Sequence, residues 1–387
     1  MAAAAIDVAV IGGGPIGCAL ACALRDSGLH CLILEARPAD APSADARTLA
    51  LSYGSRLVLE RLDAWRAIEP LTAITSIHVS QRGGFGRTVL EASDVGLEAL
   101  GYVAPFSATH RALAAQLPRD VELRRGVTVA SIETGTGEVR MRCTAERAEF
   151  DLPARLAVVA DGGAGLAQSL GRAFVTRDYR QVAVVAMVRA SSPHRGRAYE
   201  RFTPDGPAAL LPSGEEFALV WSCPTEASPR LLSLPDEAFL SELQAHFGDR
   251  AGRFVAVRAR AAFPLSLRFA RAPVGSRTVM LGNSAQMLHP IAGQGFNLGL
   301  RDAWELSRSI REYGADDPGS ARVLERYRKA RLPDRMAGIA ATDVLTRLFS
   351  NDYGWLSPLR GAAIAALDLV PFAKRFLMRR MIFGSAL

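Results

Sequence analysis

The sequence has no apolar run of the roughly 18 residues that a membrane-spanning helix requires. It also lacks a block of consecutive Lys or Arg residues, a zinc-finger spacing and the aromatic motif of an RNA-recognition domain. We therefore expect neither a membrane span nor binding to nucleic acid, although the formal net charge at pH 7 is +7.

Cysteine is also scarce, with five residues in the chain and no Cys-x-x-Cys pair. An odd number of cysteines, together with an N-terminus that lacks the charged region of an export signal, predicts reduced thiols and a cytoplasmic protein. Cys18 and Cys22 lie four residues apart, and we expect both to pack between a helix and a sheet. Neither a metal cluster nor a Ser-His-Asp arrangement is visible, so no metal is expected.

What the chain does have is the composition of a packed enzyme. Hydrophobic residues make up 49% of it and charged residues 22%, which is ordinary for a globular protein. Its 387 residues are enough for two or three structural units and for a large buried cofactor site.

The N-terminal residues have the pattern of a strand, a helix and a second strand. Residues 6–11 form a β-branched apolar run, which is typical of a strand buried on both faces. Residues 15–27 are rich in Ala, Leu and Cys and stop at Gly28, which indicates a helix, and residues 31–35 form the next buried strand. Together they predict one βαβ unit.

Three glycines stand between the first strand and the helix in the spacing of a dinucleotide-binding turn. Gly12 permits the tight turn, Gly14 leaves room for the phosphates, and Gly17 lets the helix pack on the strand. The N-terminus of the helix adds N–H donors for a pyrophosphate. Glu35 follows eighteen residues after Gly17, where a carboxylate can accept hydrogen bonds from the adenosine ribose. The pattern leaves NAD and FAD both open.

The nucleotide-binding fold does not continue in one block. Short buried strands recur at 156–160 and 278–282, and a long helix is expected from Gly295 to about Tyr313. Between them, residues 173–270 have the pattern of long strands with one helix, which predicts a second, sheet-rich domain.

Two further motifs follow these strands. Asp161-Gly162 stands at the tip of the 156–160 strand, and the run HPIAGQGFNLGLRDA occupies 289–303. The glycines of this run let the backbone approach a planar ring, and a helix that begins near Gly295 points N–H groups at a ring edge that becomes negative on reduction. A simple dehydrogenase needs neither motif.

With these motifs the sequence resembles the FAD-dependent aromatic hydroxylases of ubiquinone biosynthesis, a branch of the single-component flavoprotein monooxygenases. It is similar in particular to the 2-polyprenyl-6-methoxyphenol hydroxylase branch, and the resemblance covers nearly the whole chain. The residues that carry it are the dinucleotide glycines with Glu35, the Asp45-Ala46-Arg47 region, Arg111, Asp161-Gly162 and the run at 289–303.

The resemblance implies a cofactor, a reaction and a set of contacts. FAD is the expected cofactor, O₂ the co-substrate, and NAD(P)H or a partner reductase the electron donor. Reduced flavin would form a C4a-hydroperoxide, whose distal oxygen the electron-rich ring of a polyprenylated phenol attacks. The expected flavin contacts are Gly12, Gly14, Gly17, Glu35, Arg47, Arg111, Asp161, Gly162, Asn283, Gly293, Gln294, Gly295, Phe296 and Asn297.

Three positions near the flavin have individual interpretations. Most members of the family have Gly-Asp where this chain has Gly282-Asn283, and the Asn amide oxygen can accept the ribityl hydrogen bond instead. His289 and Pro290 are the candidate catalytic residues beside the flavin. His289 could move a proton at neutral pH, or it could hold the turn by hydrogen bonding and packing.

The resulting fold prediction is an α/β Rossmann-like FAD-binding domain with an inserted sheet-rich α+β substrate domain and a helical C-terminus. The FAD-binding domain takes residues 1–172 and 271–330, the substrate domain 173–270 and the helical region 331–387. Helix stops in and near the last region are expected at Pro333, Gly354, Pro358 and Pro371.

The last residues, 358–387, alternate basic and large apolar side chains. This pattern suits an interfacial helix at the inner face of a membrane, which could bring a polyprenylated phenol from the bilayer to the flavin. It equally suits an ordinary helix packed on the domain with its Lys and Arg residues solvated.

Two rival functions share the same scaffold. One is an FAD-dependent isoprenoid reductase or cyclase that inserts no oxygen. The other is a non-catalytic subunit of a membrane-associated ubiquinone-biosynthesis complex, against which the intact glycines, Glu35 and Asp161 argue.

Overall fold

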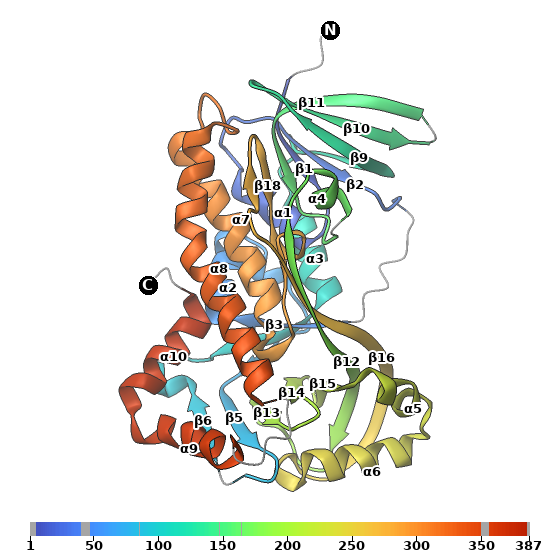
Figure 1. Cartoon of the computed structure of the whole chain (residues 1–387), viewed down its shortest axis with the longest axis vertical. Coiled ribbons are helices and arrows are strands. Elements are labelled where there is room, and N and C mark those ends of the chain that lie inside the picture. Colours follow the sequence, from blue (N-terminus) through green and yellow to red (C-terminus); the bar gives the residue numbers. More distant parts are fainter. Residues whose placement is uncertain are drawn as a thin grey trace.

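The computed structural model describes residues 5–39, 47–84, 86–146, 148–163, 165–349 and 356–384. They form two eight-stranded sheets, one three-stranded sheet and the helices that pack on them. The first sheet and the α9–α10 corner lie toward opposite ends of the molecule (Figure 1). No helix in this described part is long and apolar enough to cross a bilayer.

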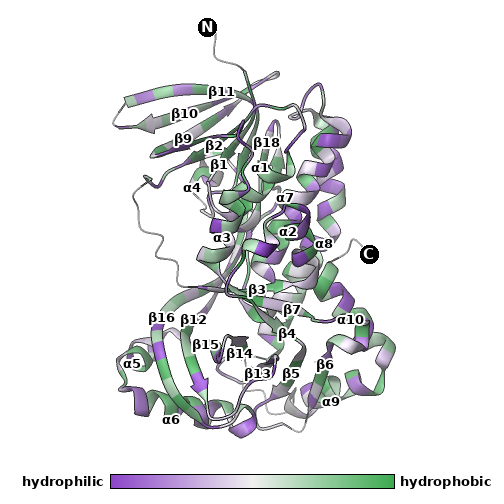
Figure 2. Ribbon diagram, turned by 180° about the vertical axis from the view of Figure 1, so that it is seen from behind, coloured by the Kyte–Doolittle hydropathy of each residue, from purple (hydrophilic) through white to green (hydrophobic). Residues whose placement is uncertain are grey.

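The first sheet contains the predicted dinucleotide-binding unit. Its parallel strands run in the order β18-β11-β1-β2-β8, with an antiparallel extension formed by β9, β10 and β11. The last four residues of β11, which pair with β1, are continuously buried, whereas its outer half alternates hydrophilic and hydrophobic residues (Figure 2). The strands are β1 (Ile6–Ile11), β2 (Cys31–Glu35), β8 (Glu122–Arg125), β9 (Val127–Thr134), β10 (Val139–Ala145), β11 (Ala148–Val159), β17 (Val274–Gly275) and β18 (Thr278–Met280).

Helices cover one face of this sheet. Buried residues of α1, α2, α3, α7 and α8 share one hydrophobic core with β1, β2, β11 and β18, and Cys18 and Cys22 lie in it as expected. The other face packs against α4 and the β9–β10 extension. The helices are α1 (Pro15–Ala23), α2 (Tyr53–Arg61), α3 (Phe106–Ala115), α4 (Gly165–Ser169), α7 (Gln294–Tyr313) and α8 (Ala321–Phe349).

The second sheet has the order β19-β16-β12-β15-β14-β13-β5-β6. It extends beyond the expected segment 173–270, because β5 and β6 come from the chain before it and β13 pairs in parallel with β5. Helices α5 and α6 cover one face with a separate core. The elements are β5 (Ser76–Gln81), β6 (Arg87–Glu91), β12 (Phe174–Ala190), β13 (Arg197–Phe202), β14 (Ala208–Ser213), β15 (Glu216–Pro224), β16 (Phe254–Ala270), β19 (Gln286–Met287), α5 (Ser228–Ser233) and α6 (Asp236–Phe247).

The third sheet joins the two larger units. It has the order β3-β7-β4, formed by β3 (Thr48–Ser52), β7 (Gly101–Pro105) and β4 (Thr72–Ile74). Ile74 and Val103 of this sheet pack against Ala198 of β13. The third sheet therefore contacts the face of the second sheet that α5 and α6 leave free.

The C-terminal helices correct two of the predicted stops. Helix α8 continues through Pro333, because this residue is exposed while Arg331, Asp334 and Arg335 around it are held by buried hydrogen bonds. Pro358 lies in the first turn of α9 (Leu356–Leu369), where a missing N–H breaks no intrahelical bond.

The remaining expected stops have different outcomes. Helix α10 (Pro371–Phe383) begins at Pro371, as predicted. Gly354 lies outside the described residues. Met378 and Ile382 of α10 pack against buried residues of β6 and of the segment that follows it. The other side of α10 is exposed.

Candidate active site

The glycine turn after β1 has the geometry that its spacing predicts. Gly12 has φ of +111°, and a Cβ there would lie 2.5 Å from the carbonyl oxygen of Ala160. A Cβ at Gly17 would lie 2.0 Å from the carbonyl oxygen of Gly12, so only glycine lets α1 begin this close to β1. Around Gly14 no atom lies within 4 Å of the Cβ position, which leaves open space at the N-terminus of α1 for a pyrophosphate.

Glu35 closes the turn at the end of β2. Its Oε2 accepts a hydrogen bond from the Gly13 amide at 2.8 Å, and its Oε1 accepts from Nε and the amide of Arg37 at 3.0 Å each. Burial raises the pKa of Glu35, but the hydrogen bonds and charge of Arg37, with the Gly13 amide, outweigh it and hold that pKa below its usual value. The carboxylate is therefore ionised and ready to accept ribose hydroxyls.

His110 is a residue of this turn that sequence reasoning missed. Its Nε2 lies 2.7 Å from the carbonyl oxygen of Gly13, and burial lowers the pKa of His110. The neutral ring donates to that carbonyl and fixes α3 against the glycine turn. A lone His in a helix gives no local signal of this contact.

The two arginines assigned by resemblance lie in different surroundings. The Arg47 guanidinium carbon is 5.1 Å from the ring centre of Phe106 and 6.0 Å from that of Phe263, which links β3 to β16. Arg111 is exposed on α3, one residue after His110. Asp45 and Ala46 lie outside the described residues, and flavin contacts of both arginines stay a prediction.

Asp161 ties together the loops that follow β11 and β18. Its Oδ1 accepts from Ser284 Oγ at 2.7 Å, and Ser284 Oγ accepts from the Gly162 amide at 2.9 Å. Between these loops the Asn283 side chain is exposed, and its carbonyl accepts from Arg268 at 3.0 Å. The structure thus brings Asp161, Gly162 and Asn283 into one loop cluster at the carboxyl ends of parallel strands.

The loop at Gly282 is held by a buried ionic network that sequence reasoning did not assign. A Cβ at Gly299 would lie 3.0 Å from Gly282 Cα, so α7 approaches this loop closely. Asp302 accepts from the Gly282 amide at 3.3 Å and from Arg331 Nε at 2.8 Å. Asp334 accepts from Arg331 at 2.7 Å within α8 and from Arg301 of α7 at 2.9 Å, so the network links α7 to α8. The network fixes where Asn283 points.

The glycine-rich run opens α7 where the sequence places it. Gly293 has φ of +60°, and a Cβ there would lie 2.7 Å from Ala50 Cβ. At Gly295 no atom lies within 4 Å of the Cβ position. Gln294 and Phe296 are both partly buried beside it. The helix N-terminus therefore faces open space large enough for the edge of a ring.

The side chain of Asn297 forms all of its hydrogen bonds with other residues of the protein. It is 1% exposed; its Oδ1 accepts from the Ser52 amide at 2.9 Å and from Ser55 Oγ at 2.7 Å. Its Nδ2 donates to the carbonyls of Ala50 and Gly293 at 2.9 and 2.8 Å. Four hydrogen bonds use the full capacity of an amide, so only the backbone of Asn297 remains for a ligand.

His289 has the surroundings of a residue that holds the turn. It is fully buried, burial lowers its pKa to about 4, and its Nδ1 accepts from the Ile291 amide at 3.4 Å. Its ring packs edge-on against Tyr179 at 5.5 Å between centres. Pro290 caps the short helix Ile291–Gly293 that leads into α7. These contacts favour the positioning interpretation of His289 over proton transfer.

The open positions together fit FAD. Gly14 offers room for the pyrophosphate, Glu35 an acceptor for the adenosine ribose, and Asn283 an amide for the ribityl chain. The N-terminus of α7 at Gly295 would then face the pyrimidine edge of the ring system, where backbone N–H groups would stabilise an anion.

Comparison with known proteins agrees with this geometry. The family model described as "FAD binding domain" matches residues 5–341. Ubiquinone hydroxylase UbiL of Rhodospirillum rubrum is 32% identical over 396 residues, covering 96% of this chain and 88% of that protein. The 3-demethoxyubiquinol 3-hydroxylase of Escherichia coli is 28% identical over 397 residues, covering 95% and 96%.

Solved structures share the fold. The p-nitrophenol 4-monooxygenase PnpA of Pseudomonas putida superposes with a TM-score of 0.79 at 16% identity, covering 99% of both chains. The predicted fold class, the cofactor and the family resemblance are thereby confirmed. The chain belongs to the FAD-binding domain family and is an FAD-dependent aromatic hydroxylase of the flavoprotein monooxygenases.

Proposed function

We propose that the protein hydroxylates the aromatic ring of a polyprenylated phenol in ubiquinone biosynthesis, and that Glu200 binds the phenol hydroxyl. The names of its relatives support the pathway, since they are ubiquinone hydroxylases and a demethoxyubiquinol hydroxylase. The bound flavin, once reduced by NAD(P)H or a partner reductase, supplies oxygen activated from O₂. The residues of the protein must orient the aromatic ring of the phenol and accept the proton of its hydroxyl group.

The observation that carries the proposal is one row of side chains across the second sheet. Glu200 of β13 lies opposite Ala209 and Val79, Ala209 opposite Val220, and Val220 opposite Val185. All five are partly exposed, and Glu200 is the one ionisable group among them. An apolar surface with one carboxyl is what a prenylated phenol requires.

The row lies on the face of the sheet that α5 and α6 leave free. On the same strand, Ala198 packs against the third sheet, and the Phe202 ring stacks on Phe349 of α8 at 4.1 Å. Glu200 stands between these two contacts. It therefore faces the region between the third sheet and the end of α8.

The carboxyl of Glu200 has neither a hydrogen bond nor an ion pair with any described residue. Burial raises the pKa of Glu200 to about 8. A carboxyl with a pKa near the operating pH is suited to accept the phenol proton, which increases the electron density of the ring. Electron density is what the attack on activated oxygen needs.

Replacing Glu200 with Gln should lower kcat/KM for the phenol roughly 100-fold or more, because the amide cannot accept the proton. The parent rate should rise as the pH passes through about 8, where the carboxylate forms, and the variant should lack this step. Steady-state hydroxylation across pH 6 to 10 tests both expectations. Glu216→Gln on β15, which breaks an ion pair with Arg258, is the matched control.

A second measurement on the same variant does not depend on activity. The folded-state pKa of Glu200 lies above the usual 4.5, so the folded protein binds more protons between these values. The free energy of unfolding of the parent should therefore fall as the pH rises from about 4.5 to 8, and that of the Gln variant should fall less over the same range. Identical rate profiles and identical stability profiles would exclude the role of Glu200.

The reaction itself is tested with ¹⁸O₂. Incubation with NAD(P)H, a prenylated phenol and ¹⁸O₂ should give a ring hydroxyl that carries ¹⁸O. Reduction or cyclisation of the prenyl chain without label in the product would instead establish the isoprenoid reductase or cyclase. A protein that binds no FAD and turns over nothing would be the non-catalytic subunit.

We also propose that the α9–α10 corner contacts an anionic bilayer, from which the prenyl tail enters. Leu369 and Phe372 are 81% and 80% exposed, and Phe376 is 60% exposed. Arg375 and Arg379 are exposed beside them, so apolar and basic groups share one surface. The opposite side of α10 packs on the protein.

Replacing Phe372 and Phe376 with Ser should weaken binding to phosphatidylglycerol vesicles roughly 100-fold, since each Phe contributes about 1.5 kcal/mol or more by burial. Vesicle sedimentation of the FAD-bound protein measures the change. Val255→Ser, at an exposed apolar residue of β16 away from this corner, serves as the control. Equal sedimentation of all three proteins would exclude this surface. Assembly into a biosynthetic complex stays a prediction.

A further inference from the structure

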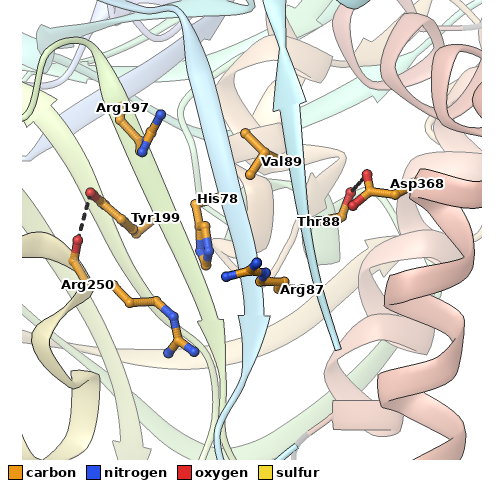
Figure 3. A pocket seen from close by; sticks show the side chains of 8 residues that line it. All are labelled: His78, Arg87, Thr88, Val89, Arg197, Tyr199, Arg250 and Asp368. Carbon is orange, nitrogen blue, oxygen red and sulfur yellow. Dashed lines mark hydrogen bonds between the residues drawn. The ribbon is translucent and has the colours of Figure 1, made fainter. Parts of the chain in front are cut away.

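A second pocket lies away from the flavin site, at the edge of the second sheet. Its volume is about 500 Å³. Strands β5, β6 and β13 form its base, and the turn after α6 and helix α9 form its sides (Figure 3). The lining residues are His78, Arg87, Thr88, Val89, Arg197, Tyr199, Arg250 and Asp368.

His78, Arg197 and Tyr199 of this pocket lie on the opposite face of the sheet from the row that contains Glu200, whereas Thr88, in the edge strand β6 opposite Val79, lies on the face of that row. Tyr199 and Glu200 are neighbours in β13, so their side chains point to opposite faces of the sheet. Tyr199 packs on Phe217 and Phe247 in the core beneath α6. The pocket therefore opens on the α6 side, and its ligand would not touch the flavin.

The pocket carries excess positive charge. Arg87, Arg197 and Arg250 form no ion pair with any carboxylate in the described part of the chain, and Arg197 donates only to Ser76 Oγ at 3.2 Å. The acidic lining residue is already engaged, because Asp368 accepts from Thr88 Oγ1 at 2.5 Å and pairs with Lys374 at 3.3 Å. Three guanidinium groups are thus uncompensated.

A buried imidazole points to a ligand independently of these charges. His78 is 8% exposed, and its Nδ1 is buried without a hydrogen-bond partner among the described residues. Burial lowers the pKa of His78, and the charges of Arg250, Arg197 and Arg87 lower it further. A buried polar atom without a hydrogen bond destabilises the protein unless a ligand satisfies it.

The positive region continues along β13. Arg201 lies two residues beyond Tyr199, on the same face, and its Nε and Nη1 are buried without a described partner. Burial lowers the pKa of Arg201, and the neighbouring charges of Arg250 and Arg82 add to this effect. Several guanidinium groups thus lie close together here, and the one carboxylate that lines the pocket in the described part of the chain, Asp368, is engaged by Thr88 and Lys374.

We propose that this pocket binds a phosphate-bearing ligand through Arg87, Arg197, Arg250 and His78. Guanidinium groups form paired hydrogen bonds with phosphate oxygens, and a neutral imidazole adds one N–H donor. The volume of about 500 Å³ leaves room beside a phosphate for the organic part of an ester. The source is either a soluble phosphate ester or the headgroup of a phospholipid. The inference does not rest on the proposed reaction.

The test uses the FAD-bound protein and three probes. These are glycerol 3-phosphate, inorganic phosphate, and phosphatidylcholine vesicles with and without phosphatidic acid. Calorimetry measures the soluble probes and sedimentation the vesicles. Binding of glycerol 3-phosphate identifies a soluble ester, whereas binding that appears only with phosphatidic acid identifies the lipid headgroup. No response to any of the probes overturns the proposal.

Variants connect the binding to this pocket. Arg197→Met and Arg250→Met should each weaken the response roughly 10- to 100-fold. Arg197→Lys keeps the charge but not the planar fork, and should weaken it less. Arg119→Met removes the same charge from an exposed site elsewhere and should change nothing. An unchanged flavin spectrum shows that each variant is folded. Parental binding by both Met variants contradicts the proposal.

Discussion

Replacement of Gly14 with Val is expected to weaken FAD binding roughly 30- to 150-fold without unfolding the protein. The backbone at Gly14 has φ of −71° and ψ of 179°, which Val adopts without strain. No protein atom lies within 4 Å of the added Cβ. The only group that the new side chain can displace is the pyrophosphate, so the loss should appear as affinity and not as stability of the apoprotein.

Fluorescence titration of the apoprotein with FAD measures this change. Gly137→Val is the matched control, because Gly137 is equally open and lies in the turn between β9 and β10. Gly17→Val is the opposite case, since its Cβ would lie 2.0 Å from the Gly12 carbonyl and should damage the fold itself. If Gly14→Val bound FAD like the parent, the pyrophosphate would not lie in front of this turn.

Replacement of Arg331 with Met should lower the free energy of unfolding by about 3–5 kcal/mol, because it leaves buried carboxylates without their partner. The side chains of Arg331 and Asp302 are 7% and 2% exposed. Burial lowers the pKa of Arg331, but the negative charges of Asp302 and Asp334 have the larger effect and raise it. Because Asp302 also holds the Gly282 amide, FAD should dissociate faster as well.

Urea unfolding of the FAD-bound protein, followed by flavin release, measures both effects. Arg328→Met provides the control one turn earlier in α8, where the ion pair with Glu325 is exposed and screened by solvent, so its loss should change stability little. A double variant with Asp302→Asn should lose less than the sum of the single losses, since both act on one interaction. Equal stability of the Arg331 and Arg328 variants would show that the network does not hold the loop.

The sequence by itself determined the elements whose signals are local. The βαβ unit, the turn at Gly12 and the start of α7 follow from apolar periodicity and from backbone angles that only glycine adopts readily. These signals depend on neighbours within a few residues. They were enough to predict the fold class and a dinucleotide, whereas FAD was chosen over NAD only through the resemblance to the aromatic hydroxylases.

Tertiary structure alone decided the rest, because those features depend on partners far away in the chain. Strand β5 joined the second sheet by pairing with β13 across more than a hundred residues, and β6 joined it by pairing with β5. Buried ion pairs to α7 hold α8 on both sides of Pro333, through Arg331 with Asp302 and Asp334 with Arg301. The side chain of Asn297 forms hydrogen bonds with the backbone of Ser52 and Ala50, which are far away in the chain. Glu200 became an isolated carboxyl through its cross-strand neighbours, since burial and pairing are properties of the packed molecule and not of a sequence segment.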